Sequence, residues 1–288
     1  MATLLEKCHN IKNNKEANLK PENLKAGVTC LGVVGTLEEG TNTSDANATA
    51  EDILLNKTAY VNGEKIEGTL VLPKITNGDD LFYNGARADQ IYEILSLCDQ
   101  ITSAKRMFSV LPKSIVHLDC SSLDVSKVVD MTNIFNQSFY LESIDFTGWH
   151  TDSLEIIQQP FCRCNELTSL DLSGFDLSKT RNINGLFVSL DNLTNLKSPK
   201  NIGKGFNRQK EDDVNHYILL HNEKLTAESI ADVLDNLYDL NLTYDVANGG
   251  TLYKQSVLLG PTNYTKVTSE QIAAAEAKGW KISEKNSV

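Results

Sequence analysis

The sequence predicts an α+β protein in three parts: small β-hairpin modules at the N-terminus, a short solenoid of repeats, and an α/β module that closes it. Three observations indicate this fold class. Two related segments with hairpin signals lie within residues 1–75. Apolar residues recur every 26 positions within residues 113–207, and residues 208–288 alternate strand-like and capped helical patterns. We expect residues 76–112 to form a linker and an N-terminal cap or degenerate repeat.

The composition limits the classes of partner. The chain has 288 residues, 41% of them hydrophobic, and a formal net charge of −11. This length fits two or three modules with packed cores. Because there is no basic surplus, we expect neither nucleic acid nor an anionic membrane as a partner. The sequence has no run of about eighteen apolar residues and no signal-peptide pattern, so we expect no membrane insertion and synthesis in a cytoplasm.

The N-terminal region contains two related segments, "PENLKAGVTCLGVVGTLE" (21–38) and "AEDILLNKTAYVNGEKIEGTLV" (50–71), joined by a polar linker. Each predicts a short helical turn and a hairpin, and an Asn-Gly pair in the second segment is a strong hairpin signal. The candidate anchoring residues of this hairpin are Tyr60, Asn62, Gly63 and Glu64. Neither segment is large enough to hold a core, so we expect burial against neighbours in a homo-oligomer.

Two apolar columns define the repeats. The first column is Leu118, Ile144, Leu170 and Leu196, and the second is Phe135, Phe161 and Phe187. Each unit opens with a short strand-like segment and cannot bury its own apolar face, so neighbouring units must stack and share a core. The period lies in the leucine-rich-repeat range of roughly 20–29 residues.

The C-terminal region predicts two helices separated by a strand. Thr226 can cap the first helix, and the apolar face of that segment consists of Ile230, Val233, Leu234 and Leu237. "TLYKQSVLLG" (251–260) is strand-like. Thr268 and Gln271 predict a capping box for the second helix, and Gly279 stands where a helix C-terminus favours glycine. We expect this module to cover the exposed end of the repeats.

Two resemblances extend this interpretation. "LTSLDLSGFDLSKTRNINGLF" (167–187) resembles the BspA-like leucine-rich repeats of bacterial and phage surface proteins. "LDCSSLDVSKVVDMTNIF" (118–135) keeps the V-x-D-M-x-x-x-F part of that pattern best, whereas the middle unit, with Trp149 and Pro160, departs most. "KTAYVNGEKIEGT" (57–69) resembles modules of structural proteins of phages of Firmicutes.

The resemblances imply a non-enzymatic structural protein of a phage particle, made in the host cytoplasm and exposed on the particle surface. Its N-terminal region would bind other virion proteins, and its repeats would face a host surface glycan or protein. They also favour a trimer as the oligomer. A tail-fibre or baseplate protein is the leading class. A capsid-attached head fibre or decoration protein, and a bacterial leucine-rich-repeat surface adhesin, are the alternatives.

Strand alternation predicts which side chains the repeats expose. Leu118 and Cys120 point inward, so their neighbours point outward. The candidate binding face is therefore His117, Asp119, Ser143, Asp145, Ser169, Asp171, Asn195 and Lys197. Three readings are open: a solvated face whose carboxylates accept local backbone hydrogen bonds, a contact surface for a glycan or protein, and a cation site.

We expect no catalytic residues, no metal site and no cofactor. The sequence contains neither a phosphate-binding glycine loop nor a nucleophile elbow, and its histidines form no HExxH motif. The six cysteines are interpreted as reduced thiols at packing positions, and Cys162 and Cys164 stand where other units have ordinary repeat residues. Trp149 resembles a sugar-stacking aromatic in isolation, but the repeat places it in the core column of Leu123 and Phe175.

Overall fold

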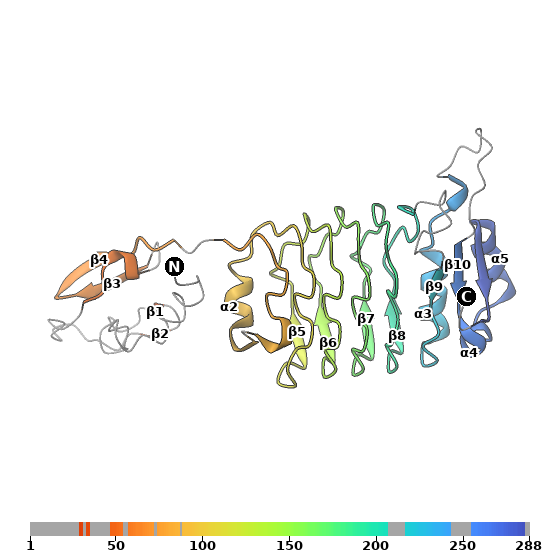
Figure 1. Cartoon of the computed structure of the whole chain (residues 1–288), viewed down its shortest axis with the longest axis horizontal. Coiled ribbons are helices and arrows are strands. Elements are labelled where there is room, and N and C mark those ends of the chain that lie inside the picture. The colour runs from red at the N-terminus through yellow and green to blue at the C-terminus, as the bar shows by residue number, and fades with distance from the viewer. Residues whose placement is uncertain are drawn as a thin grey trace. The chain divides into compact units, whose positions relative to one another are not determined.

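The protein is mixed α/β, with small sheets and few helices. The computed structural model describes residues 29–30, 33–34, 47–53, 57–71, 74–86, 88–206, 217–242 and 255–285. The chain divides into two compact units, Met1–Lys74 and Ile75–Val288, and Figure 1 shows the elements of each. The first unit contains two hairpins. The second is a stack of similar segments with an α/β module at its C-terminal end.

The first unit contains the hairpin that the Asn-Gly pair predicts. Strand β3 (Thr58–Val61) pairs antiparallel with β4 (Glu64–Glu67). Asn62 and Gly63 have φ angles of 53° and 82°, the positive values that a type I′ turn requires. A 3₁₀ turn, η2 (Ala50–Asp52), precedes the hairpin, so both elements expected of the second module are confirmed.

The other N-terminal module is described only in part. Strand β1 (Thr29–Cys30) pairs antiparallel with β2 (Val33–Val34), which confirms a small hairpin there. The helical turn expected before it and most of the polar linker after it lie outside the described residues.

The second unit stacks parallel segments at a constant step. Strands β5 (His117–Asp119), β6 (Ser143–Asp145), β7 (Ser169–Asp171) and β8 (Asn195–Lys197) follow one another along the stack (Figure 1). β5 pairs with β6, and β7 with β8, so that each residue faces the residue 26 positions later. A second track of parallel bridges joins the units at Ser103, Asp130, Ile156 and Asn182.

A column of stacked aromatic rings forms the core between these tracks. Phe82, Phe108, Phe135 and Phe161 are buried, and successive ring centroids lie 5.3, 5.2 and 5.6 Å apart with interplanar angles of 8°, 5° and 7°. Offset-stacked rings at this spacing attract one another beyond the burial of their surfaces. Phe187 is buried at the next step.

Residues 76–112, expected to form a linker and an N-terminal cap or degenerate repeat, already take part in the stack. The backbone N–H of Ile75 donates to Leu97 O, and that of Phe82 donates to Met107 O, each at 2.8 Å. Residues 75–112 thus pair with their neighbours as the later units do. They also contain a short helix, α2 (Ile91–Leu95), and the 3₁₀ turns η3 (Tyr83–Gly85) and η4 (Ala88–Gln90), which the sequence did not predict.

One inserted residue separates the early units from the later ones. Contacts across this junction span 27 residues instead of 26, and Leu111 is the extra residue, buried at the corner before the next turn. Its N–H donates to Ser138 Oγ (3.1 Å), which in turn donates to Phe108 O (2.7 Å). The Ser138 hydroxyl therefore supplies the acceptor that the displaced backbone would otherwise lack.

Each unit also turns through two left-handed positions. The first column is Asp80, Arg106, Asn133, Gln159 and Gly185, and the second is Asn84, Val110, Gln137, Arg163 and Ser189. Left-handed geometry costs an L-residue roughly 1–2 kcal/mol. The N–H groups of the first four residues in each column donate to the next unit, as Arg106 does to Thr132 O (2.9 Å). Contacts between units therefore stabilise turns that one unit alone would not hold.

The two ends of the stack are closed by side chains. At the front, the Tyr92 hydroxyl lies 3.4 Å from the N–H of Asp119 in the first strand. At the back, helix α3 (Ala227–Asp235) lies against β8. Ser229 Oγ accepts the N–H of Leu196 (2.9 Å), and Asp232 Oδ2 accepts that of Ser198 (2.5 Å). Helix side chains thus take the place of a fifth strand.

The remaining C-terminal elements form a parallel three-stranded sheet in the order β11-β10-β9. Its strands are β9 (Tyr217–Leu219), β10 (Gln255–Leu258) and β11 (Trp280–Ser283). Helix α5 (Ser269–Ala277) packs on β11, while α4 (Gly260–Tyr264) and η5 (Leu240–Leu242) join the elements.

The predicted caps in this module are confirmed. Thr226 accepts the N–H of Ser229 at the start of α3, and Thr268 and Gln271 form a capping box on α5. Gly279 follows α5 with a φ of 88°. Residues 207–216 and 243–254, which include part of the expected strand at 251–260, lie outside the described residues.

We predict that Asp232→Ala destabilises the protein far more than Asp235→Ala. Both substitutions remove an aspartate from α3, so the gain in helix propensity is matched. Only Asp232 accepts the N–H of Ser198, and leaving that donor without an acceptor should cost about 1–3 kcal/mol. Urea unfolding followed by circular dichroism measures both free energies. Equal losses in the two variants would show that the end of β8 needs no side-chain acceptor.

Candidate functional site

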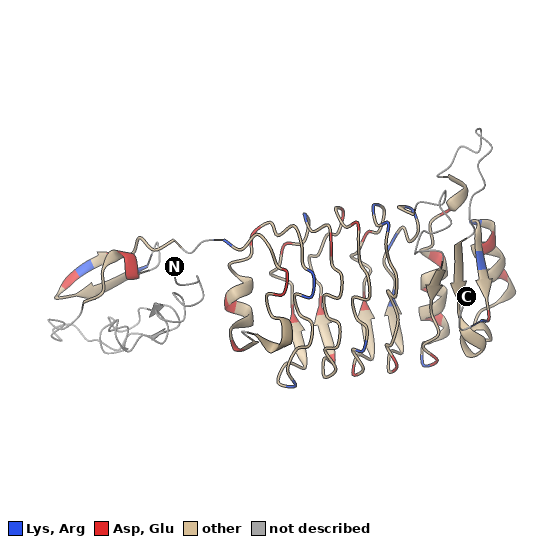
Figure 2. Ribbon diagram, in the orientation of Figure 1, with Lys and Arg blue, Asp and Glu red and all other residues tan. Residues whose placement is uncertain are grey.

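The strand face is defined here as the outward residues of β5 to β8: His117, Asp119, Ser143, Asp145, Ser169, Asp171, Asn195 and Lys197. All eight are exposed, as strand alternation predicts. The inward Leu118, Leu170 and Leu196 are buried, while Ile144 is only partly buried. Figure 2 shows acidic positions recurring on neighbouring strands of this stack.

The aspartates of the strand face end the strands. Asp119, Asp145 and Asp171 each accept the backbone N–H two residues ahead, at 2.9, 2.8 and 3.0 Å. This is the Asx turn, in which a short carboxylate substitutes for a backbone acceptor. The expectation that these carboxylates accept local backbone hydrogen bonds is confirmed. The same contact recurs elsewhere in the units at Asp124, Asp130, Asp176 and Asn182.

One carboxylate of the strand face also forms an ion pair between units. Lys197 Nζ lies 2.7 Å from Asp171 Oδ2, one strand away. Partial burial alone would raise the pKa of Asp171, but hydrogen bonds from Lys197 and Ser173 outweigh it and hold the pKa below its usual range. At Asp119, hydrogen bonds from Ser121 lower the pKa. Both carboxylates are therefore charged at neutral pH.

His117, Ser143 and Glu142 form the arrangement closest to a catalytic triad. His117 Nδ1 lies 2.8 Å from Ser143 Oγ, and His117 Nε2 lies 4.0 Å from Glu142 Oε2. The His117 and Glu142 side chains are 68% and 56% exposed. Water screens such a contact, whereas an activated nucleophile depends on a desolvated base held by a third group. The arrangement offers hydrogen-bond donors and acceptors to a ligand rather than an activated serine.

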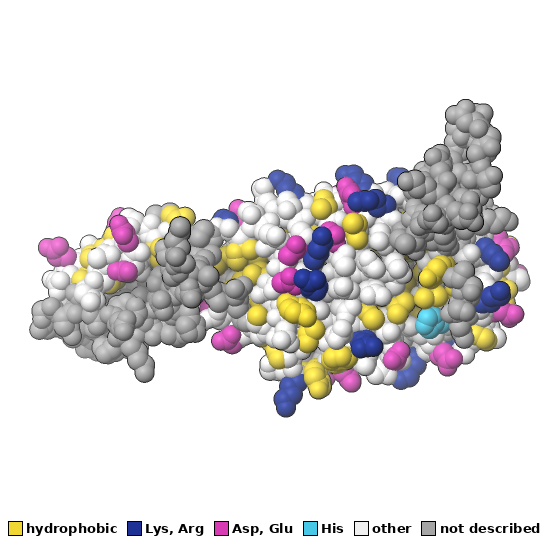
Figure 3. Space-filling model, in the orientation of Figure 1, with side chains coloured by type: hydrophobic (Ala, Val, Ile, Leu, Met, Phe, Trp, Pro, Cys, Tyr) yellow, Lys and Arg dark blue, Asp and Glu magenta, His cyan; other side chains and the backbone are white. Residues whose placement is uncertain are grey.

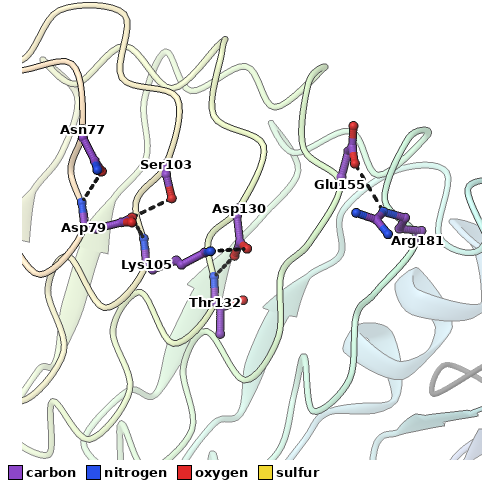
Figure 4. Close-up of polar contacts among 8 residues, drawn as sticks. All are labelled: Asn77, Asp79, Ser103, Lys105, Asp130, Thr132, Glu155 and Arg181. Atoms are coloured by element: carbon purple, nitrogen blue, oxygen red, sulfur yellow. Dashed lines mark hydrogen bonds and ion pairs between the residues drawn. The ribbon is translucent and has the colours of Figure 1, made fainter.

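A second polar row joins consecutive units away from the strands. Asp79 Oδ1 accepts Ser103 Oγ at 2.6 Å and the N–H of Lys105 at 2.8 Å, and Lys105 Nζ lies 3.2 Å from Asp130 Oδ2 (Figure 4). Farther along, Arg181 lies 3.2 Å from Glu155, also in Figure 4. These contacts use side chains to reinforce the backbone contacts between units.

Another ion pair stands at the first left-handed column. Arg106 donates two hydrogen bonds of 2.6 Å to Asp80 and lies over the Tyr83 ring, 5.7 Å from its centroid. The hydrogen bond from Arg106 lowers the pKa of Asp80. The apolar columns do not reveal these pairs, although the sequence holds a signal for them: opposite charges stand 26 residues apart at Asp80 and Arg106, and at Glu155 and Arg181.

The hairpin residues proposed for anchoring lie where the sequence placed them. Tyr60 is half-buried on β3, and Asn62, Gly63 and Glu64 are exposed at the turn. They belong to the first unit, whereas every strand-face residue belongs to the second.

Burial suppresses the reactivity of three of the described cysteines, Cys98, Cys120 and Cys164. Cys98, Cys120, Cys162 and Cys164 are free thiols. Burial raises the pKa of Cys98 to about 11 and that of Cys164 to about 12, so neither is a thiolate at neutral pH. Within the described part of the chain, no group of three or more His, Cys, Asp or Glu residues could hold a metal ion.

Trp149 lies in the core, as the repeat predicts. It is buried with Leu123 and Phe175, and its Nε1 donates to Cys120 O at 2.8 Å. No helix among the residues with described structure is long and apolar enough to cross a membrane.

Two neighbouring aromatic residues, Phe139 and Tyr140, are exposed together, and we call this pair the aromatic corner. Their side chains are 37% and 52% exposed, on the turn that leads into β6. On the face drawn in Figure 3, hydrophobic side chains lie in several separate groups among polar and charged ones. The repeat columns gave no signal for this pair, because the columns register apolar residues that are shared between units.

Comparison with known proteins finds one family. Residues 76–204 match the model of a family described as "Mycoplasma protein of unknown function, DUF285". The matched segment is similar to that family and runs from the front of the stack to just beyond β8. No curated protein and no solved structure matches the chain.

We predict that Lys197→Met raises the pKa of Asp171 towards its ordinary value. Because the folded-state pKa is lowered, the pair stabilises the protein above the ordinary aspartate pKa near 4 and stops doing so as pH falls through the lowered value. Wild type and variant should therefore differ slightly in unfolding free energy at pH 7 and converge in acid. Carboxyl-carbon NMR titration measures the pKa.

Asp119 is the internal control for that titration. Its pKa is lowered by Ser121, which the substitution does not touch. A pKa of Asp171 unchanged by the substitution would show that Lys197 does not pair with it in solution.

Proposed function

We propose that residues 75–206 form a leucine-rich-repeat solenoid of the BspA-like type and that the chain is a non-enzymatic structural protein of a phage particle. In this proposal the N-terminal modules anchor the chain to other virion proteins, and the solenoid displays the strand face to a host surface glycan or protein. The tail-fibre or baseplate type is the leading form. The protein would be made in the host cytoplasm and exposed on the particle.

The observation that carries the display role is the way the stack satisfies its own backbone. Neighbouring units take up each other's N–H groups, and Ser229 and Asp232 take up those of the last strand. The eight side chains of the strand face are left exposed on strands whose backbone is paired with neighbouring units. Binding surfaces are commonly built in this way, from side chains on regular elements held by their neighbours.

The anchoring role is supported by the size of the hairpins. An isolated two-stranded hairpin is at best marginally stable in water, and β3 and β4 form a sheet of two strands. We propose that copies of this chain and other virion proteins supply this burial, with a trimer as the oligomer.

We expect the full-length chain to be a trimer in solution. Light scattering should give a mass about three times the 31.8 kDa of one chain, because the small N-terminal sheets gain burial from neighbouring copies. A chain that starts at Ile75 is the control and should have the mass of a monomer. A monomeric full-length protein whose hairpins are folded by NMR would contradict the oligomer.

Immunogold labelling of intact particles tests the proposed function. An antibody against residues 217–285 is applied to particles purified from a lysate of cells that carry the coding sequence. We expect label at the tail tip or baseplate under negative stain, because the strand face must reach the host. Label on the capsid would replace this with the head-fibre or decoration alternative.

A bacterial surface adhesin is the second candidate, and the family match favours it. The description of the matched family names Mycoplasma, a bacterium. The same antibody separates the two candidates. Label on the surface of cells, with none on particles, would reject the virion proposal and support the adhesin.

A further inference from the structure

Four equivalent turns lead into the four strands β5 to β8. In each, the backbone N–H of the last residue donates to the carbonyl three residues earlier. The turns span 112–115, 138–141, 164–167 and 190–193, and the four distances are 3.0, 3.2, 3.3 and 3.0 Å. Their central pairs are Lys113–Ser114, Phe139–Tyr140, Asn165–Glu166 and Asp191–Asn192. The backbone is the same, so the differences lie in the side chains.

Two aromatic residues are unusual at the centre of such a turn. Turns favour Asn, Asp and Ser, because short polar side chains bond to the nearby backbone and stay hydrated. Three of the four turns have polar central residues, yet the same hydrogen bond closes them. Phe139 and Tyr140 are therefore not needed for the turn, and 37% and 52% of their surfaces face solvent. A broken local rule without a structural gain indicates a functional site.

Exposed polar residues follow the aromatic corner in the chain. After Tyr140, Leu141 is buried, and Glu142 and Ser143 are exposed. His117 of the neighbouring strand lies 2.8 Å from Ser143 Oγ and 4.0 Å from Glu142 Oε2. Two rings are thus followed by a carboxylate, a hydroxyl and an imidazole, which together supply donors and acceptors at the start of the strand face.

We propose that the aromatic corner is a stacking platform for an uncharged saccharide. One face of a sugar ring is apolar and would lie on Phe139 or Tyr140, while its hydroxyl groups would bond to Glu142, Ser143 and His117. The proposal rests on the display role proposed above and names the class of ligand and the residues that take it.

The size of the corner favours a saccharide over a protein. Burying an aromatic side chain removes at most about 150–250 Å² from water, and both rings here are already partly covered. A stable protein interface takes about 800 Å² from each partner. A sugar ring matches one aromatic ring in extent, and it needs polar partners at its rim.

The charge of the corner favours a neutral ligand. The chain has a net charge of −11, and Glu142 carries its carboxylate two residues from Tyr140. An anionic sugar would be repelled by both, because like charges close together at a binding site oppose association. The saccharide class is therefore one of neutral hexoses, deoxyhexoses and N-acetylhexosamines.

The repeat supplies the variants that test this. The full-length chain is applied to an array of neutral oligosaccharides built from glucose, galactose, rhamnose and N-acetylhexosamines, with sialylated and phosphorylated glycans beside them. F139N/Y140E places the residues of the next turn at the corner, and we expect about tenfold or weaker binding. N165D/E166N makes the same kind of exchange one turn later and should bind as wild type does.

A third variant tests whether an added aromatic pair strengthens saccharide binding. N165F/E166Y would place a second aromatic pair one unit away, and we expect stronger binding of oligosaccharides that span both. All three variants use residues that an equivalent turn already holds, so circular dichroism should show unchanged melting. These melting curves separate a lost ligand contact from a lost fold.

Three outcomes would overturn the proposal: no neutral saccharide bound by the wild type, binding unaffected in F139N/Y140E, or binding restricted to the charged glycans. None of these outcomes affects the immunogold result on particles, so the saccharide proposal can be rejected while the proposed function stands. Particles without label would reject the proposed function, whatever the array shows.

Discussion

The structure depends on one interaction: a backbone N–H in one unit donates to a carbonyl in the next unit, about 25 residues later in the chain. Arg106 to Thr132 O and Asn133 to Gln158 O, at 2.9 and 2.8 Å, are two examples from the left-handed column. Each unit has too little regular structure to satisfy its own backbone, and a buried polar group left without a partner is costly. The stacked phenylalanines add apolar contact, but they can meet only because the backbone contacts set the spacing.

That constraint explains why the two ends look different from the middle. A stack built on contacts between units has unsatisfied donors wherever it stops. The front uses a tyrosine hydroxyl at Asp119, and the back uses a helix whose Ser229 and Asp232 face the last strand. The middle units are paired on both sides and need no capping side chains, so their outward side chains can vary. Asp171 and Lys197 form an ion pair there, while Phe139 and Tyr140 are exposed without harm to the turn.

The sequence predicts the shared core well and the individual surface poorly. Periodicity located the strands around Leu118 and Leu170 and placed Trp149 inside, because burial constrains residue type. Capping residues indicated the helix starts at Thr226 and Thr268. For residues 76–112 periodicity left a linker and a cap or degenerate repeat open, since Leu111 shifts the register by one residue there. It missed the aromatic corner. The exposed turn positions do not keep one residue type from unit to unit. Only a comparison of the equivalent turns shows that the aromatic residues Phe139 and Tyr140 stand where the other turns have polar residues.

The inserted Leu111 shows that the register of this stack is set at each junction and not over the whole chain. One extra residue is absorbed at a single corner, with Ser138 as the repair, and the units on both sides keep their contacts. A gain or loss of a complete unit would disturb even less, because both new neighbours would match. Each such duplication would lengthen the stack by one strand spacing, about 4.8 Å. The distance from the front of the stack to its closing helix can therefore change during evolution in equal steps of one strand spacing.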